Sequence, residues 1–373
     1  MKKKMLYLSV YDPHVPYTGA GVRGGEFVTN LAKTFDIDLI YIEGSGHPGD
    51  LLLEDKFEYR VKGVGKKIKL PFSLRNYFIF CKQMLMEAEN LISHKKYSVV
   101  LCDYGLSAIY GLKLKKKYGI PFVYCSHNLE FRQYLGKAKQ DKRRYLLVPW
   151  VYKVEKAGVK KCDLLVPISK LEAEYYTRWT SLDKMYVVPQ CFNEDIFNPF
   201  YEPPKNDPKI VLFFGNYNIS TNRDAVYAAR DKVVDQVVAK YPDVKFQFIG
   251  ANPPTDINHP NMEFLGFVDS LEEYLKKCDV MMSPILAGWG MPTKIIESLA
   301  CGKPIVATEQ AARAVPKKYK ILKIVDIDNF ADAIVAALKE KKPVDSSDFE
   351  LLKQEFTWAG AISKLTKRIE QII

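Results

Sequence analysis

The chain has 373 residues, of which 47% are hydrophobic, so it can fill two cores of ordinary size. Its formal net charge of +11 comes entirely from residues 51–150, which hold 20 Lys and Arg against 8 Asp and Glu, while the remainder holds 35 against 36. No apolar run approaches the roughly 18 residues of a membrane span, and the basic residues 2–4 lead into a strand-like run rather than a signal peptide. We therefore expect neither export nor membrane insertion.

The basic clusters within residues 51–150 lie beside an aromatic-rich stretch at 70–80. Cations next to aromatic side chains suit an anionic membrane surface or a charged acceptor, although any single cluster is more often a solvated helix face. Nucleic acid is not expected as a partner, because the sequence carries no helix-turn-helix, zinc-ligand or RNA-binding signature. The seven cysteines occur singly and mostly in apolar runs, so we expect reduced core thiols in a cytoplasmic protein.

The first half of the chain alternates between strand-like and helix-like segments. A strand at 6–10 precedes a glycine-rich loop and a helix at about 24–35, and a second helix is expected at 106–117. Further strands are expected at 37–42, 99–102, 121–125 and 164–167, followed by a helix from Lys170. This is the rhythm of βαβ units in a parallel sheet.

The same rhythm restarts after a segment with four prolines at 198–208, which we interpret as an interdomain linker. Strands are expected at 210–214, 245–249, 262–265 and 280–285, with a helix at 224–240. The predicted fold is α/β, with two Rossmann-like parallel-sheet domains facing a central cleft. The domains are expected at 1–197 and 209–356, and a terminal helix at 357–373 could cross back to the first domain.

Residues 288–302 predict a loop and a helix, with Pro292 just inside the helix start and Gly302 just past its end. Lys294 and Glu297 share one face near the positive end of the helix dipole. The loop follows a strand, at the sheet edge where open α/β sheets bind nucleotides and phosphates. The pattern fits both an anion site and an ordinary surface pair.

Gly19, Gly21 and Gly24 match the dinucleotide-binding pattern G-x-G-x-x-G, and Glu43 lies near the distance of a ribose-binding carboxylate. A dehydrogenase would follow from that interpretation. However, the eight residues 11–18, with two prolines, separate the pattern from the first strand. A long loop that carries backbone amides towards a phosphate fits this spacing better.

Three other features bear on chemistry. The D-x-D pairs at 36–38 and 326–328 could hold a divalent ion, but they lie at strand edges and we attribute them to chance. His127 closes the strand at 121–125, so it is either a general acid or base in the cleft or a structural histidine. The loop from Gly215, with Asn216 and Arg223, suits a phosphate or sugar as well as an ordinary turn.

Read in order, these segments resemble the retaining glycosyltransferases of family 4, which have the GT-B architecture. The resemblance covers nearly the whole chain and rests on order and spacing rather than on one motif. It is carried by residues 19–25, 126–130, 162–169, 187–199, 215–226, 264–268 and 288–302.

The resemblance implies that the second domain binds a nucleotide-sugar and the first binds a carbohydrate-containing acceptor. Glu297 would contact the ribose, Lys294 the diphosphate, and His127 the sugar near the reacting carbon. The implied donor-binding residues are Gly19, Ala20, Gly21, Gly215, Asn216, Arg223, Gly266, Phe267, Val268, Gly290, Met291, Pro292, Thr293, Lys294 and Glu297. No metal or other cofactor would be required, because cationic side chains and helix amides stabilise the departing diphosphate.

Several positions depart from the family pattern. Trp289 stands where relatives place the first of two glutamates, and Asn216 and Asn222 stand where many place a phosphate-binding Arg and Lys. We predict transfer of a hexosyl group, with GDP-mannose favoured over UDP-glucose on family frequency. The alternatives are an NAD-dependent dehydrogenase and a non-catalytic nucleotide or glycan binder.

Overall fold

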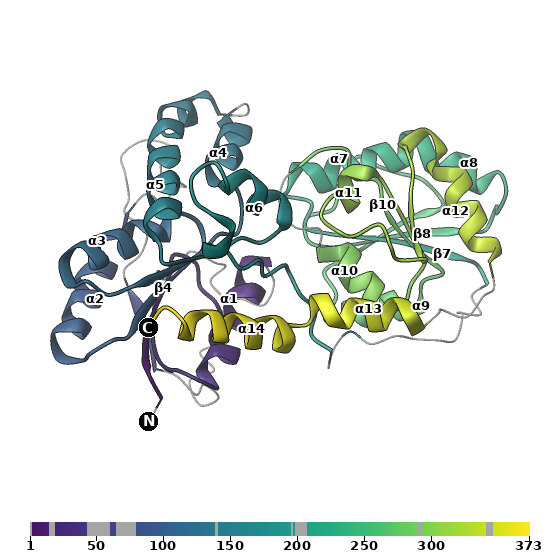
Figure 1. Ribbon diagram of the computed structural model, residues 1–373. Helices are drawn as coiled ribbons and strands as arrows, with labels where there is room; N and C mark the ends of the chain where they lie inside the picture. The colour runs from purple at the N-terminus through teal and green to yellow at the C-terminus, as the bar shows by residue number, and fades with distance from the viewer. Residues whose placement is uncertain are drawn as a thin grey trace. The chain divides into compact units, whose positions relative to one another are not determined.

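The computed structural model describes residues 2–14, 19–42, 60–64, 80–138, 141–194, 197, 207–288, 293–340 and 346–373. The chain divides into two compact units (Figure 1). Unit 1 comprises Met1–Gln190 and Trp358–Ile373, and unit 2 comprises Cys191–Thr357. The sequence places the division at 198–208, whereas the structure places it before that segment, between Gln190 and Cys191.

Unit 1 contains a six-stranded parallel sheet in the order β3-β2-β1-β4-β5-β6. The order reverses between β1 and β4, which defines the switch point where doubly wound sheets bind ligands. The strands are β1 Lys4–Ser9, β2 Asp36–Ile42, β3 Arg60–Val64, β4 Val99–Asp103, β5 Phe122–Cys125 and β6 Leu164–Val166.

The helices of unit 1 are α1 Gly19–Ala32, α2 Lys82–His94, α3 Ala108–Tyr118, α4 Glu130–Ala138, α5 Val148–Lys161, α6 Lys170–Tyr176 and α14 Trp358–Glu370. Among its described residues, 3-10 turns occur at η2 Gly105–Ser107, η3 Lys142–Leu146 and η4 Leu182–Lys184. The expected start of the first helix at residue 24 is wrong, because the glycines from Gly19 onward already form helical turns of α1. The terminal helix α14 belongs to unit 1, where it packs against α1 (Figure 1).

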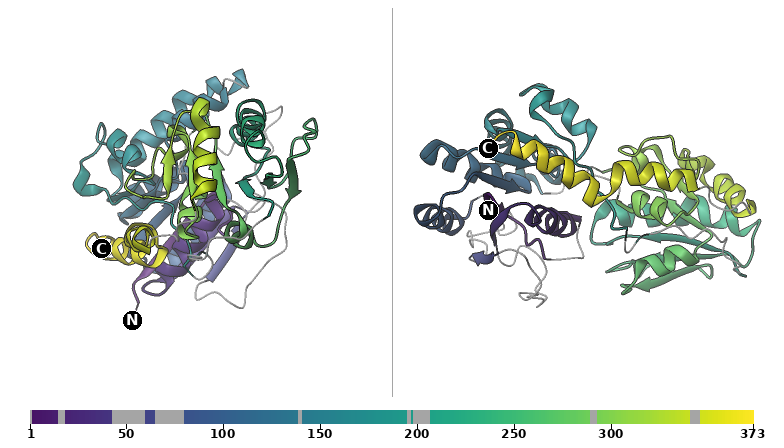
Figure 2. Two further views of the ribbon diagram at one scale, coloured as in Figure 1. Left: turned by 90° about the vertical axis from the view of Figure 1, so that its right-hand side faces the viewer. Right: turned by 60° about the horizontal axis from the view of Figure 1, so that its bottom comes forward.

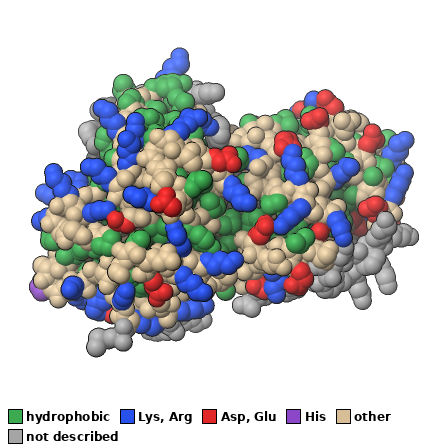
Figure 3. Space-filling model, in the orientation of Figure 1, with side chains coloured by type: hydrophobic (Ala, Val, Ile, Leu, Met, Phe, Trp, Pro, Cys, Tyr) green, Lys and Arg blue, Asp and Glu red, His purple; other side chains and the backbone are tan. Residues whose placement is uncertain are grey.

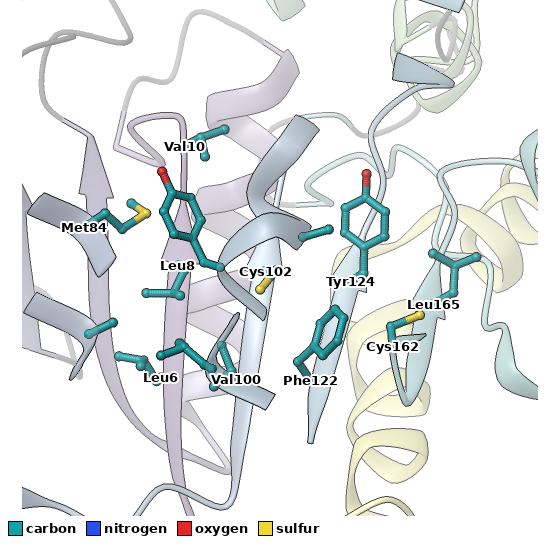
Figure 4. Close-up of a cluster of buried hydrophobic side chains, with 14 of the residues drawn as sticks. Leu6, Leu8, Val10, Met84, Val100, Cys102, Phe122, Tyr124, Cys162 and Leu165 are labelled. Atoms are coloured by element: carbon teal, nitrogen blue, oxygen red, sulfur yellow. The ribbon is translucent and has the colours of Figure 1, made fainter. Parts of the chain in front are cut away.

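The core of unit 1 follows from the alternation of side chains along its strands. Leu6, Leu8 and Val10 point to one face, where they meet buried residues of α2, α3 and α5 (Figure 4). Helices α1 and α14 contact each other through the rings of Phe27 and Trp358, whose centroids are 6.1 Å apart. The sheet therefore has helices on both faces, as a parallel sheet requires.

Two glycines bring α3 and α5 close to the sheet and to each other. A Cβ on Gly111 of α3 would lie 2.4 Å from the Cδ2 atom of Phe122 and 2.8 Å from the sulfur of Cys102. A Cβ on Gly158 of α5 would lie 2.6 Å from the Cβ of Ala108. A larger side chain at either position would have to displace a helix.

Unit 2 repeats the architecture with a second six-stranded parallel sheet in the order β12-β11-β10-β7-β8-β9. Its strands are β7 Ile210–Phe214, β8 Lys245–Ile249, β9 Met262–Gly266, β10 Val280–Ser283, β11 Ile305–Ala307 and β12 Leu322–Ile324. The order reverses between β7 and β10, so this sheet has the same kind of switch point as unit 1. The predicted fold class is confirmed.

Helices cover both faces of this sheet (Figure 2). One hydrophobic cluster lies beneath α9, α10, α11 and α13, and another lies beneath α7, α8 and α12. The helices are α7 Ser220–Ala229, α8 Asp235–Val238, α9 Leu271–Lys277, α10 Thr293–Ala300, α11 Glu309–Ala312, α12 Phe330–Lys339 and α13 Ser346–Phe356, with a π turn η5 Arg230–Val234 and a 3-10 turn η6 Ile327–Asn329. The helix expected at 224–240 begins earlier, at Ser220.

The structure bears on the predicted state of the cysteines and on the predicted lack of membrane insertion. All seven cysteines are free and buried, as expected for core thiols. Within the described ranges, no helix combines the length and the apolar character needed to cross a membrane. Most of the aromatic-rich stretch, at 70–79, lies outside the described residues.

The packing of α3 predicts the effect of filling its glycine. Gly111→Ala should lower the free energy of unfolding by about 1–3 kcal/mol, because the new methyl group overlaps Phe122. Gly136→Ala in α4 is the matched control, since nothing lies within 4 Å of its added Cβ. The control should raise stability by about 0.5–1 kcal/mol through helix propensity. Urea titration of the full chain measures both, and equal effects would contradict the packing argument.

Candidate active site

The loops at the carboxyl edge of the unit 2 sheet are joined backbone to backbone. The amide of Gly215 donates to Ile249 O at 2.8 Å, and the amide of Gly250 donates to Gly266 O at 2.7 Å. Gly250 has a φ of +142°, and a Cβ there would lie 1.9 Å from Gly215 O. Only glycine allows this approach, which fixes the loops after β7, β8 and β9 as one surface.

Asn222 links this surface to α10. Its Nδ2 donates to Asn216 O at 2.8 Å, and its Oδ1 accepts from the Lys294 ammonium at 2.8 Å. A Cβ on Gly215 would lie only 2.8 Å from Asn222 Nδ2, so the glycine makes room for the amide. The Lys294 ammonium also lies 4.7 Å from the centroid of the Phe213 ring. These contacts hold the lysine between β7 and β10, at the switch point.

Burial shifts the pKa values of Lys294 and Glu297, the two ionisable groups on α10. It lowers the pKa of Lys294 to about 8, opposed by the nearby charge of Glu297. It raises the pKa of Glu297 to about 7, opposed in turn by Lys294. Both residues are half-buried. The edge therefore holds a cation whose charge is only partly compensated, and an incoming anion would favour its protonated form.

The other expected donor-binding residues of unit 2 are spread over the same edge. Gly215, Gly266, Val268 and Thr293 are half-buried, and Asn216, Arg223 and Phe267 are exposed. Thr293 begins α10, so the amides of its first turn face the end of the helix where anions are stabilised. Gly290, Met291, Pro292 and the unexpected Trp289 lie outside the described residues.

In unit 1, His127 is fixed by a carboxylate from the neighbouring strand. Its Nε2 lies 2.8 Å from Asp103 Oδ1, and the exposed fractions of the two side chains are 4% and 1%. The ring also meets Tyr104 edge-on, with centroids 4.8 Å apart. Burial lowers the pKa of His127, although Asp103 opposes the shift. The imidazole is therefore mostly neutral at pH 7, and because Nε2 must donate to Asp103, its Nδ1 is an acceptor.

A buried glutamate on α5 holds the loop that carries His127. Glu155 accepts from the amides of Glu130 and Phe131 at 3.0 Å each, and from the Tyr176 hydroxyl at 2.8 Å. It thereby caps the first turn of α4, directly after the histidine loop. Burial raises the pKa of Glu155 to about 7, and these hydrogen bonds oppose the shift.

The glycines of the G-x-G-x-x-G pattern lie in helix α1. Some form its amino end, and others allow it to pack closely against the preceding loop. Gly19, Ala20 and Gly21 form the first turn of α1. Gly24 and Gly25 lie deeper in the helix, where an added Cβ would meet Pro13, at 3.1 Å from its Cβ and 2.7 Å from its carbonyl oxygen respectively. Glu43, the partner expected in a dinucleotide site, lies outside the described residues.

Three of the four aspartates in the D-x-D pairs form ion pairs with basic side chains. Asp36 pairs with Lys4, both Asp36 and Asp38 pair with Arg60, and Asp328 pairs with Lys232 at 2.8 Å. Across the described ranges, no three His, Cys, Asp or Glu side chains are grouped as a metal site would need.

Sequence reasoning missed Asp103, Glu155 and Tyr176. Asp103 directly follows the strand expected at 99–102, so strand order would have paired it with His127. Nothing in the sequence around Glu155 or Tyr176 indicates their role, because they lie on two different helices, α5 and α6, that pack beside the start of α4.

Two family models match the chain in tandem. The model described as "Glycosyltransferase Family 4" matches residues 17–195, and the model described as "Glycosyl transferases group 1" matches residues 208–340. A phosphatidyl-myo-inositol mannosyltransferase of Mycolicibacterium smegmatis is 24% identical over 182 residues. That match spans 46% of this chain and 44% of the relative, less than half the length of either protein.

Several solved structures share the whole fold at low sequence identity. Sucrose-phosphate synthase from Thermosynechococcus elongatus has a TM-score of 0.73 at 18% identity, with 99% of each chain covered. HepE of Anabaena, in complex with UDP and glucose, has a TM-score of 0.67 at 13% identity, again over 99% of each chain. A glycosyltransferase from Rickettsia africae has a TM-score of 0.67 at 15% identity, covering 100% of this chain and 99% of its own. The chain belongs to glycosyltransferase family 4 and has the GT-B fold.

Proposed function

We propose that this protein transfers a hexosyl group from a nucleotide diphosphate sugar to a carbohydrate-containing acceptor. The observation that carries the proposal is the half-buried Lys294 ammonium, which Asn222 holds at the switch point of the unit 2 sheet. A lysine hydrogen-bonded to an amide oxygen keeps its charge for a ligand better than one already paired with a carboxylate. A diphosphate supplies the matching negative charge.

The donor would lie along the carboxyl edge of unit 2. Lys294 and the amides at the start of α10 would bind the diphosphate, and Glu297 would accept a hydrogen bond from the ribose. The segment Gly266 to Val268 would contact the base, since Phe267 is 60% exposed beside it. Gly215, Asn216 and Arg223 would complete the phosphate and sugar contacts.

Unit 1 would supply the acceptor side and His127. The neutral imidazole can accept a hydrogen bond from a sugar hydroxyl at Nδ1, with Asp103 fixing its orientation. The amides of Gly19, Ala20 and Gly21, at the amino end of α1, would favour phosphate. Transfer with retention would follow from front-face attack: the acceptor oxygen bonds to the anomeric carbon on the face from which the phosphate leaves, the bond between that carbon and the phosphate oxygen breaks, and the leaving phosphate oxygen takes the acceptor proton. We propose no role for a metal ion, because cations and helix amides suffice to stabilise the leaving group.

GDP-mannose is the donor we propose first. The partial match to a mannosyltransferase supports it, whereas HepE, solved with UDP and glucose, supports UDP-glucose as the alternative. The acceptor would be a glycan, a lipid or a protein. The basic charge of residues 51–150 supports a peripheral position at an anionic membrane.

Calorimetric titration with GDP-mannose, UDP-glucose and NADH tests the donor class. One nucleotide-sugar should bind, and Glu297→Ala should weaken it by about 1–3 kcal/mol through loss of the ribose hydrogen bond. Glu309→Ala is the control, because the side chain of this exposed residue pairs with Lys317. Binding of NADH alone would contradict the proposal, and donor binding without any turnover would identify a non-catalytic binder.

Donor affinity should depend on pH with a maximum between about pH 7 and 8. Above the Lys294 pKa of about 8, the free protein must take up a proton before binding a diphosphate, so affinity falls by up to about tenfold per pH unit. Below the Glu297 pKa of about 7, the carboxyl must lose a proton to accept from the ribose, so affinity falls on that side too. Lys294→Arg should remove the alkaline limb and Glu297→Gln the acidic limb. A flat profile for the unaltered protein would refute the two assignments.

His127→Ala should reduce turnover by about 100-fold, while the affinity for the free nucleotide diphosphate changes little, because the residue is expected at the sugar. Asp103→Asn should give a smaller effect in the same direction, since it alters the imidazole tautomer rather than removing the ring. Steady-state kinetics together with calorimetry separate these quantities. Unchanged turnover in His127→Ala would exclude the role.

A further inference from the structure

Unit 1 contains a cavity of about 610 Å³ where α3 and α5 end, beside the first residues of β5 and β6. Its floor is apolar and includes Ile109, Leu112 and Ala157. Its rim is strongly basic and is formed by Lys113, Lys115, Lys116, Lys160, Lys161 and Lys184. We call this feature the lysine pocket. Figure 3 shows Lys and Arg crowded over the part of unit 1 that α3 and α5 form.

Asp163, the carboxylate that lines the lysine pocket, already accepts two hydrogen bonds. Asp163 accepts from the Lys115 ammonium at 2.6 Å and from the amide of Phe122 at 2.9 Å. Lys115 also donates to Lys161 O at 3.0 Å, which locks it in place. Within the described part of the chain, the exposed side chains of Lys116, Lys160 and Lys161 have no acidic partner.

A charge balance shows that helix ends alone do not account for these lysines. Each helix carboxyl end carries about −0.5 of an elementary charge, so α3 and α5 together supply about −1. Asp163, and Asp183 beside Lys184, add two negative charges. Against six lysines, this leaves a surplus of about three positive charges, and the apolar floor reduces its screening by water. An anion with several charges would relieve this repulsion.

We propose that the lysine pocket binds a phosphate-bearing anion, presented either by an anionic phospholipid or by a free phosphorylated small molecule. The apolar floor would contact the glycerol or ring carbons, and Lys116, Lys160 and Lys161 would contact the phosphate oxygens. Its volume falls in the usual range for small-molecule sites. The inference does not depend on the proposed transfer reaction, because it rests on residues of unit 1 that we assign no part in donor binding or transfer. It builds on the anionic contact proposed above for residues 51–150 and names the side chains that would make it.

Two binding measurements on the full chain distinguish the sources of the phosphate. The first is co-sedimentation at low salt with vesicles of phosphatidylglycerol and phosphatidylcholine, compared with phosphatidylcholine alone. The second is calorimetry with inositol hexakisphosphate, in the presence of excess GDP and UDP to fill the donor site. Binding only to the anionic vesicles identifies the lipid, and binding to the soluble phosphate identifies a free ligand.

The matched variants are Lys116→Glu/Lys160→Glu/Lys161→Glu and, as the control, Lys33→Glu/Lys82→Glu/Lys153→Glu, which changes exposed lysines elsewhere on unit 1 by the same net charge. The pocket variant should lose about tenfold or more in affinity at an unchanged melting temperature, whereas the control should retain most of it. The triple arginine variant at the pocket should bind like the unaltered protein. Equal losses in both glutamate variants, or no binding to either probe, would overturn the proposal.

Discussion

The half-buried ammonium of Lys294 is the interaction on which the edge of unit 2 depends. It contacts an amide oxygen of Asn222 and the ring of Phe213, which stabilise a cation without neutralising it. Burial therefore appears as a lowered pKa for Lys294 and a raised pKa for Glu297 on the same helix. A tight ion pair between Lys294 and Glu297 would have avoided both pKa shifts, but it would also have neutralised the positive charge of the lysine. The positive charge at this edge is therefore only partly compensated within unit 2.

The backbone geometry around this lysine is set by glycine. Gly215 makes room for Asn222, and Gly250 allows the loop after β8 to touch the loop after β7. These contacts fix the position of the amide that holds Lys294. The edge of unit 1 has the same strand order but a different chemistry, since burial favours the neutral form of His127, Asp103 fixes its tautomer, and Glu155 holds the start of α4 directly after it. The shared fold thus provides two rigid edges, and the side chains decide which ligand charge each one favours.

The strands could be predicted because burial on both faces gives short apolar runs between turn residues, and β7 and β8 have the predicted limits. The sequence predicts a loop before residue 24, because glycine is a poor helix former, but Gly19 and Gly21 lie in the first turn of α1. Gly24 and Gly25, deeper in the helix, allow it to approach Pro13 closely. Glu155 could not be found from sequence, because its partners on α4 lie about 25 residues away and their proximity depends on how the helices pack. The same applies to α14, which joins unit 1 from the far end of the chain.

The lysine pocket and His127 lie at opposite ends of the same strand. Asp163 binds the amide of Phe122, the first residue of β5, whereas His127 follows the last residue of that strand. Five residues of extended chain span roughly 16 Å, about twice the screening length of roughly 8 Å at physiological salt. The surplus charge of the pocket therefore has little influence on a sugar at His127. Under the two proposals, the pocket would govern association and His127 would act in transfer, so each could be altered by separate substitutions in one unit.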